Sequence, residues 1–212
     1  MKKVKNSMKR PAVFLDRDGT LIHDAGYLSR TSQVKFFPDA VKALKLLRQA
    51  GFYLFVVSNQ SGAARGYFPE SSVKKVHRHI QSRLKSMGTG VDRFFYCPHF
   101  PLGKVKSLSK VCACRKPKPG MVREASKRYP VDLRRSYVVG DKMDDILLVR
   151  NAWLAGGVLV RTGKGRQSEK ILKVRKVGGV EVASSLLGAA RLIIKNNFSR
   201  EVRKSPAKAQ MK

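Results

Sequence analysis

The chain has 212 residues, of which 42% are hydrophobic, so it is long enough for one well-buried α/β domain and short for two. Its 45 lysines and arginines against 14 acidic residues give a formal net charge of +31, which predicts salt-dependent attraction to polyanions. The basic start leads into no apolar segment of signal-peptide length, and no segment approaches a membrane span. We therefore expect a cytoplasmic protein without membrane insertion.

Apolar residues alternate between strand and helix patterns along the chain. Short apolar runs predict buried strands at 13–15, 52–57, 93–96, 137–139 and 158–160. Apolar residues at helical spacing predict helices at 38–51, 69–88, 120–129, 146–157 and 183–195. This alternation favours right-handed βαβ units, and hence a three-layer, Rossmann-like α/β fold with a parallel sheet covered by helices on both faces.

The two ends of the chain carry charge and have little to bury. We predict a loose basic arm at 1–10, one domain at 11–195 and a disordered basic tail at 196–212. Only seventeen residues separate Thr20 from Pro38, too few for an inserted cap domain. We therefore expect loops alone to cover the functional site.

Polar residues follow the predicted strands at the points where they end. Asp16 and Asp18 follow the first strand and Ser58 follows the second, whereas Asp141 follows a later one. Lys116 lies beyond the cysteine-containing segment. The carboxyl ends of parallel strands share one edge of the sheet, where ligands bind in open α/β folds. Carboxylates one residue apart repel each other unless a cation lies between them, so this set suits metal-assisted phosphoryl transfer.

Three cysteines and one histidine crowd a short segment. An odd number of cysteines makes a poor disulfide framework. Cys97, His99, Cys112 and Cys114 instead form a Cys₃His set that suits tetrahedral Zn²⁺. Such a closed site is structural. It would pin the segment 97–114 and thereby position the two cations that follow it, at 115–116.

Together these motifs resemble those of the haloacid dehalogenase superfamily, whose phosphatases form an aspartyl-phosphate. The narrower resemblance is to phosphatases of D-glycero-D-manno-heptose 1,7-bisphosphate, and it covers residues 12–165. It rests on Asn59-Gln60-Ser61-Gly62-Ala63-Ala64-Arg65-Gly66, Cys97-Pro98-His99, Cys112-Ala113-Cys114-Arg115-Lys116-Pro117 and Gly140-Asp141-Lys142.

The resemblance implies Mg²⁺-dependent removal of the 7-phosphate from a sugar bisphosphate. Asp16 would be the nucleophile and a Mg²⁺ ligand. Asp18 would protonate the leaving oxygen, activate water and bind Mg²⁺ through its carbonyl oxygen, and Asp141 would complete the protein ligands. Ser58 and Lys116 would hold the phosphoryl oxygens. The residues expected to line the substrate pocket are Asp24, Ala25, Gly26, Tyr27, Asn59, Gln60, Ser61, Arg65, Arg115 and Lys142.

Three other functions stay open. A histidinol-phosphate phosphatase shares the zinc segment, and a DNA 3′-phosphatase has a similar Asn-Gln-x-Gly-x-x-Arg-Gly segment and would explain the charge. The third is a nucleic-acid-binding protein on an inactive phosphatase scaffold. We expect a monomer that acts on a small phosphorylated sugar and binds nucleic acid non-specifically through its charge, and we expect Asp145 to orient Lys142 or the metal shell.

Overall fold

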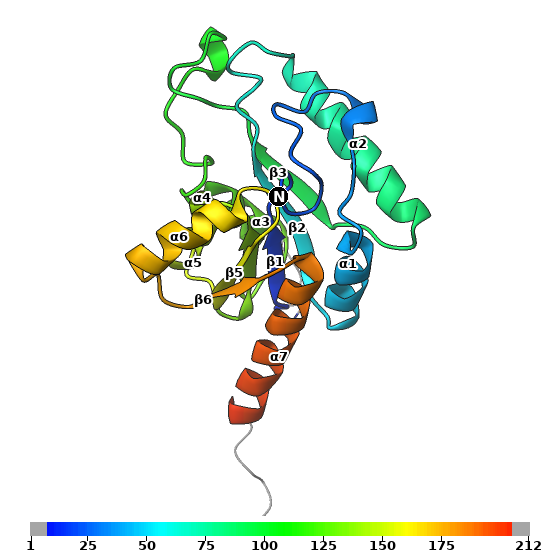
Figure 1. Cartoon of the computed structure of the whole chain (residues 1–212), viewed down its shortest axis with the longest axis vertical. Coiled ribbons are helices and arrows are strands. Elements are labelled where there is room, and N and C mark those ends of the chain that lie inside the picture. The colour runs from blue at the N-terminus through cyan, green and yellow to red at the C-terminus, as the bar shows by residue number, and fades with distance from the viewer. Residues whose placement is uncertain (1–7, 205–212) are drawn as a thin grey trace, which may run out of the picture.

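A computed structural model of the chain describes residues 8–204, in which one parallel sheet of six strands has the order β3-β2-β1-β4-β5-β6 (Figure 1). Leu15 at the end of the central strand β1 lies opposite Val56 of β2 and Val139 of β4. The predicted fold class is confirmed. The strands are β1 (Ala12–Leu15), β2 (Tyr53–Asn59), β3 (Arg93–Cys97), β4 (Tyr137–Gly140), β5 (Gly156–Val160) and β6 (Val180–Ala183).

Helices cover both faces of the sheet. The α-helices are α1 (Ala40–Gln49), α2 (Glu70–Ser86), α3 (Gly120–Arg128), α4 (Met143–Ile146), α5 (Leu148–Asn151), α6 (Gly165–Arg175) and α7 (Leu186–Lys204). Short 3₁₀ helices lie at Thr31–Gln33, Lys106–Leu108 and Leu133–Arg135. Side chains of a strand point alternately to opposite faces, so Val13 and Leu15 pack with α1, α2 and α7. Phe14 points the other way and packs with α3 and α5.

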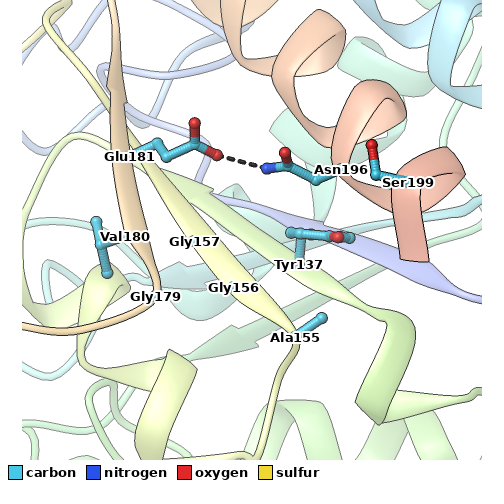
Figure 2. Close-up of a pocket in the computed structure, with 9 residues that line it drawn as sticks. All are labelled: Tyr137, Ala155, Gly156, Gly157, Gly179, Val180, Glu181, Asn196 and Ser199. Carbon is cyan, nitrogen blue, oxygen red and sulfur yellow. Dashed lines mark hydrogen bonds between the residues drawn. The ribbon is translucent and has the colours of Figure 1, made fainter. Parts of the chain in front are cut away.

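The predicted disordered tail is wrong for residues 196–204, because α7 continues to Lys204. Figure 2 shows the side chain of Asn196 facing Glu181 of β6, to which it donates a hydrogen bond; both residues line a cavity of about 380 Å³. The Ser199 hydroxyl also donates to the carbonyl oxygen of Lys195. Polar contacts thus hold a helical end that has few apolar residues. The rest of the predicted tail lies outside the described residues.

The predicted loose arm is wrong for Arg10. Its guanidinium donates two hydrogen bonds to the carbonyl oxygen of Gly51 and lies 4.4 Å from the centre of the Tyr53 ring. Its backbone N–H donates to the carbonyl oxygen of Pro130. Residues 1–7 lie outside the described part of the chain. None of the helices in the described residues combines the length and apolarity that crossing a membrane requires.

The sequence patterns missed α6 and β6, because α6 buries only one large apolar side chain, Leu172, among many charged residues. The single helix predicted at 146–157 is instead two short helices, α4 and α5. Trp153 lies two residues beyond the end of α5, with a φ of +57° and a side chain that is 65% exposed, whereas its helical spacing had indicated the core.

Candidate active site

Lys116 and two carboxylates form a buried ion-pair cluster at the carboxyl edge of the sheet. Asp16 directly follows β1, and the Lys116 Nζ lies 2.6 Å from its Oδ1 and 2.6 Å from the Asp145 Oδ1. The same Nζ donates to the carbonyl oxygen of Val57 at the end of β2. Burial lowers the pKa of Lys116, but the carboxylates of Asp145 and Asp16 outweigh burial and raise that pKa. Lys116 therefore stays a cation beside Asp16.

Two carboxylate oxygens at this edge are buried without a hydrogen-bond partner among the described residues, Asp16 Oδ2 and Asp141 Oδ1. Burial raises the pKa of Asp16, and burial together with the Asp16 charge raises the pKa of Asp141 to about 7. Ligand atoms of Asp16, Asp141 and Asp145 lie within 4.8 Å of one another, and we call these three residues the carboxylate cluster. A divalent cation would relieve this crowding of buried negative charge.

The carboxylate cluster fits Mg²⁺, although not through all three acids. The Asp145 carboxylate is already used, because its Oδ1 pairs with Lys116 and its Oδ2 accepts the Lys142 backbone N–H. The Lys142 Nζ lies 3.5 Å from the carbonyl oxygen of Asp18 and 3.6 Å from Asp141 Oδ1, so these two oxygens face a position that attracts positive charge. Together with Asp16 Oδ2, they are the oxygens that could hold Mg²⁺.

A hydrogen-bonded network holds the Asp18 carboxylate in place. The buried Arg17 donates from Nε to both Asp18 oxygens and from Nη2 to Gln60 Oε1. The Gln60 amide in turn donates to Asp18 Oδ2 and to the Ser58 hydroxyl oxygen. His77 Nε2 lies 3.2 Å from Arg17 Nη1, and burial and the Arg17 charge hold the His77 pKa well below its usual value. His77 is therefore a neutral acceptor that orients Arg17.

Two further contacts shape the turns around these side chains. The Asn59 side chain accepts the Lys116 backbone N–H and donates to the Lys116 carbonyl oxygen, which fixes the lysine's backbone. Gly19 has a φ of +91°, and a Cβ there would lie 2.2 Å from Asp141 Oδ2. Only glycine therefore allows the turn after β1 to approach Asp141 this closely.

An open cavity of about 220 Å³ adjoins the Asp18 carboxylate. Its lining residues are Asp18, Asp24, Gly26, Tyr27, Leu28, Asn59, Gln60, Ser61, Lys142 and Lys164. Most of the predicted pocket residues are among them. Lys164 was missed, although it belongs to a polar segment that follows β5, and its backbone N–H also donates to Asp141 Oδ2. The position of this segment after a strand was the signal that could have identified it.

Ala25, Arg65 and Arg115, which were also predicted for the pocket, are not among the residues that line this cavity. Both guanidinium groups lie over the ring of Phe100, at 3.7 Å for Arg65 and 5.5 Å for Arg115. Arg115 also donates to the carbonyl oxygen of His99. These two arginines therefore border the cysteine-containing segment, where cation–π contacts hold them.

The sulfur atoms and the histidine ring of that segment converge on one point. Cys114 Sγ lies 3.1 Å from Cys97 Sγ, 3.3 Å from Cys112 Sγ and 3.3 Å from His99 Nδ1. We call these four residues the sulfur cluster. The hydrogen bond between Cys114 and Cys97 lowers the pKa of the Cys114 thiol to about 5, so the Cys114 sulfur is a thiolate at neutral pH. Four converging ligand atoms fit tetrahedral Zn²⁺.

Comparisons with known proteins agree with this geometry. The HAD-hydrolase-like family model matches residues 113–189. A D-glycero-beta-D-manno-heptose-1,7-bisphosphate 7-phosphatase from Haemophilus ducreyi is 44% identical over 163 residues, which are 76% of this chain and 89% of that protein. The protein of the same name from Escherichia coli K12 is 42% identical over 154 residues, covering 73% and 81%.

A solved structure has the same arrangement of elements. The D,D-heptose 1,7-bisphosphate phosphatase from B. bronchiseptica, complexed with magnesium and phosphate, superposes with a TM-score of 0.74 at 32% identity. The match covers 88% of this chain and 99% of that one. The chain therefore belongs to the haloacid dehalogenase-like hydrolases, in the family of the heptose-bisphosphate 7-phosphatases.

Proposed function

We propose that this chain is a Mg²⁺-dependent phosphatase that removes the 7-phosphate from D-glycero-β-D-manno-heptose 1,7-bisphosphate. The observation that carries the proposal is the buried Asp16 beside Lys116, in a chain whose relatives carry that name. One oxygen of the Asp16 carboxylate has no hydrogen-bond partner within residues 8–204. A carboxylate with a free oxygen and an adjacent cation is suited to attack a phosphate.

The reaction has two steps. An oxygen of Asp16 attacks the phosphorus, the bond from phosphorus to the sugar oxygen breaks, and Asp18 gives that oxygen a proton. Water then attacks the aspartyl-phosphate and gives its proton to Asp18, and the bond between phosphorus and Asp16 breaks to release phosphate. The network of Arg17 and Gln60 supports this role, since it fixes the Asp18 carboxylate beside the cavity.

Ser58 and Lys116 would hold the phosphoryl oxygens. The Ser58 hydroxyl oxygen accepts from Gln60, which leaves its proton free to donate to phosphate. Asp16 and Asp141, with the Asp18 carbonyl oxygen, would hold Mg²⁺, which when bound withdraws negative charge from the phosphoryl group. Zn²⁺ would occupy the sulfur cluster and position Lys116, which lies two residues after Cys114.

The remainder of the substrate would lie in the cavity at the loops. Lys142 and Lys164 offer cations to phosphate oxygens there, and Asp24 offers acceptors for sugar hydroxyls. Tyr27 and Tyr67 are half-exposed, and their rings lie edge to face at 4.6 Å. A single phosphatase domain without a cap, a cytoplasmic location and a monomeric state stay predictions.

A phosphate-release assay with three substrates tests the proposal. It compares heptose 1,7-bisphosphate, histidinol phosphate and single-stranded DNA with a 3′-phosphate, each with the native chain and with Asp16→Asn. We expect the highest kcat/KM for the heptose bisphosphate and release of one phosphate per molecule. A higher kcat/KM for either other substrate would overturn the substrate assignment but not the role of Asp16.

A further inference from the structure

The chain's one tryptophan occupies a conformation that a bulky residue rarely adopts. Trp153 has a φ of +57°, and its side chain is 65% exposed. The turn is well fixed, because the Trp153 N–H donates to the carbonyl oxygen of Arg150 and the Leu154 N–H donates to that of Val149. Glycine would adopt this turn without strain. A large exposed ring held there indicates a role in binding rather than in packing.

Trp153 lines a cavity of about 630 Å³ whose rim is strongly basic, and we call it the Trp153 cavity. Arg134, Arg150, Arg175 and Lys176 surround it, and all four are exposed. The Arg134 guanidinium lies 5.1 Å from the centre of the tryptophan ring. None of the described residues that line the cavity is acidic.

The four cations of the rim are free to bind an external anion. Within the described part of the chain, no ion pair includes any of them. The neighbouring cavity of Figure 2 differs in this respect, because Glu181 lines it. Negative charge is therefore favoured at the Trp153 cavity rather than at its neighbour.

The Trp153 cavity lies at the edge of the sheet opposite the catalytic residues. Trp153 precedes the first residue of β5, and Arg134 precedes the first residue of β4. Asp16 and Asp141 instead follow the last residues of their strands. Because these strands are parallel, the two sites face opposite edges. A ligand at the Trp153 cavity therefore need not obstruct phosphate hydrolysis.

We propose that the Trp153 cavity binds single-stranded nucleic acid, with an unpaired base stacked on the Trp153 ring and its flanking phosphates paired with the surrounding cations. An exposed aromatic ring among cations is the combination that such strands require, since bases offer flat faces and the backbone offers charge. A strand is favoured over a free nucleotide because the whole chain carries a charge of +31, which a polyanion engages at several phosphates.

The fluorescence of Trp153 gives a readout confined to this cavity, because the chain has no other tryptophan. The full-length protein is titrated with a ten-nucleotide oligouridylate, and binding is followed in parallel by the anisotropy of a labelled strand. We expect quenching that saturates with the anisotropy change and weakens with salt, with a log–log slope of about −3 if four phosphates are paired.

Three other ligands distinguish binding through the bases from binding through charge alone or through a single nucleotide. An abasic strand of equal length should bind through its charge without quenching, whereas uridine monophosphate should quench only at much higher concentration. Quenching by the abasic strand or by polyglutamate equal to that by oligouridylate would overturn the proposal. Equally tight binding of the monophosphate would overturn the assignment to a strand.

Variants test the same site by anisotropy. Trp153→Ala should raise the dissociation constant for oligouridylate about tenfold, and Trp153→Phe should raise it less. The pair Arg134→Gln and Arg150→Gln should weaken binding more than Lys42→Gln and Lys45→Gln, which remove the same charge from exposed lysines of α1. Thermal unfolding checks that each variant is folded. Equal weakening by both pairs, or no effect of Trp153→Ala, would overturn the proposal.

Discussion

The carboxylate cluster and the sulfur cluster both gather ligand-type atoms, but they differ in what those atoms contact. In the carboxylate cluster, Lys116 pairs with two of the acids, and Asp16 Oδ2 and Asp141 Oδ1 remain without a hydrogen-bond partner among the described residues. In the sulfur cluster, each ligand atom lies within 3.7 Å of another ligand atom. The first therefore has oxygens left to bind a cation, whereas the ligand atoms of the second contact one another.

This difference suits the carboxylate cluster to the reaction and the sulfur cluster to a structural role. Buried oxygens without partners destabilise the metal-free fold, and they are useful only because a cation and a phosphate can approach them. In the sulfur cluster the ligand atoms contact one another instead, and Cys114 lies two residues before Lys116, whose Nζ contacts Asp16. We infer that loss of a carboxylate removes activity and leaves the fold intact, whereas loss of a thiolate affects both.

The largest effect is expected at Asp16, the proposed nucleophile. Asp16→Asn keeps the size of the side chain but removes the attacking oxygen anion, so phosphate release should fall by a factor on the order of 10⁴ or more. The melting temperature should not fall, because the substitution removes a buried charge while Lys116 keeps its pair with Asp145. Steady-state phosphate release and thermal unfolding measure the two outcomes. Undiminished turnover would show that another residue is the nucleophile.

A smaller effect, now on both activity and stability, is expected at the sulfur cluster. Cys112→Ser should lower the bound zinc, measured by elemental analysis, and should reduce kcat about 100-fold because the segment that carries Lys116 loosens. The melting temperature should fall as well. Lys110→Gln, in the same segment but without a ligand atom, is the matched control. A native chain that purifies folded without zinc would contradict the zinc assignment.

The sequence predicted where residues at the ends of strands lie, but not the contacts that join separate elements. The common location of Asp16, Ser58 and Asp141 could be predicted because a buried parallel strand places the residues at its end at a known edge of the sheet. Arg17 could not be assigned a partner, because its contacts with Gln60 and His77 join segments that only the tertiary structure brings together. The contact of His77 with Arg17 gives this histidine a positioning role in the network around Asp18.

Boundaries and exposure were harder to predict than element type. The pattern Ile146, Val149, Trp153 suggested one amphipathic helix, but periodicity does not report the left-handed turn that exposes the tryptophan ring. The end of α7 was missed for a related reason. Its last turns lack apolar residues, and the contact of Asn196 with Glu181 depends on where β6 lies.

A substitution in the hydrogen-bonded network around Asp18 should lower kcat by less than a substitution in either cluster. Gln60→Ala removes the hydrogen bonds that Gln60 makes with Arg17, Asp18 and Ser58, although Arg17 keeps its ion pair with Asp18. It should lower kcat about tenfold, because a misplaced Asp18 would protonate the leaving group less well. Gln81→Ala, which removes hydrogen bonds to the backbone of Val91, is the matched control for an amide lost far from the site. Equal kinetics for the two variants would contradict the role of Gln60.

The smallest effect is a pH dependence expected at the carboxylate cluster. Because the pKa of Asp141 rises from 3.8 to about 7 on folding, the folded metal-free chain binds this proton more tightly than the unfolded chain does. Its stability therefore falls as the pH rises from about 4 to 7 and stays low above that.

Mg²⁺ binds the ionised carboxylate, so its affinity should weaken about tenfold for each pH unit below 7. Each tenfold step lowers the Mg²⁺-induced rise in melting temperature by about 4 °C. Thermal unfolding with Mg²⁺ and with a chelator should thus differ more at pH 8 than at pH 5.5, and Asp141→Asn should reduce that difference. Equal stabilisation by Mg²⁺ at both pH values would show that the cation does not bind at Asp141.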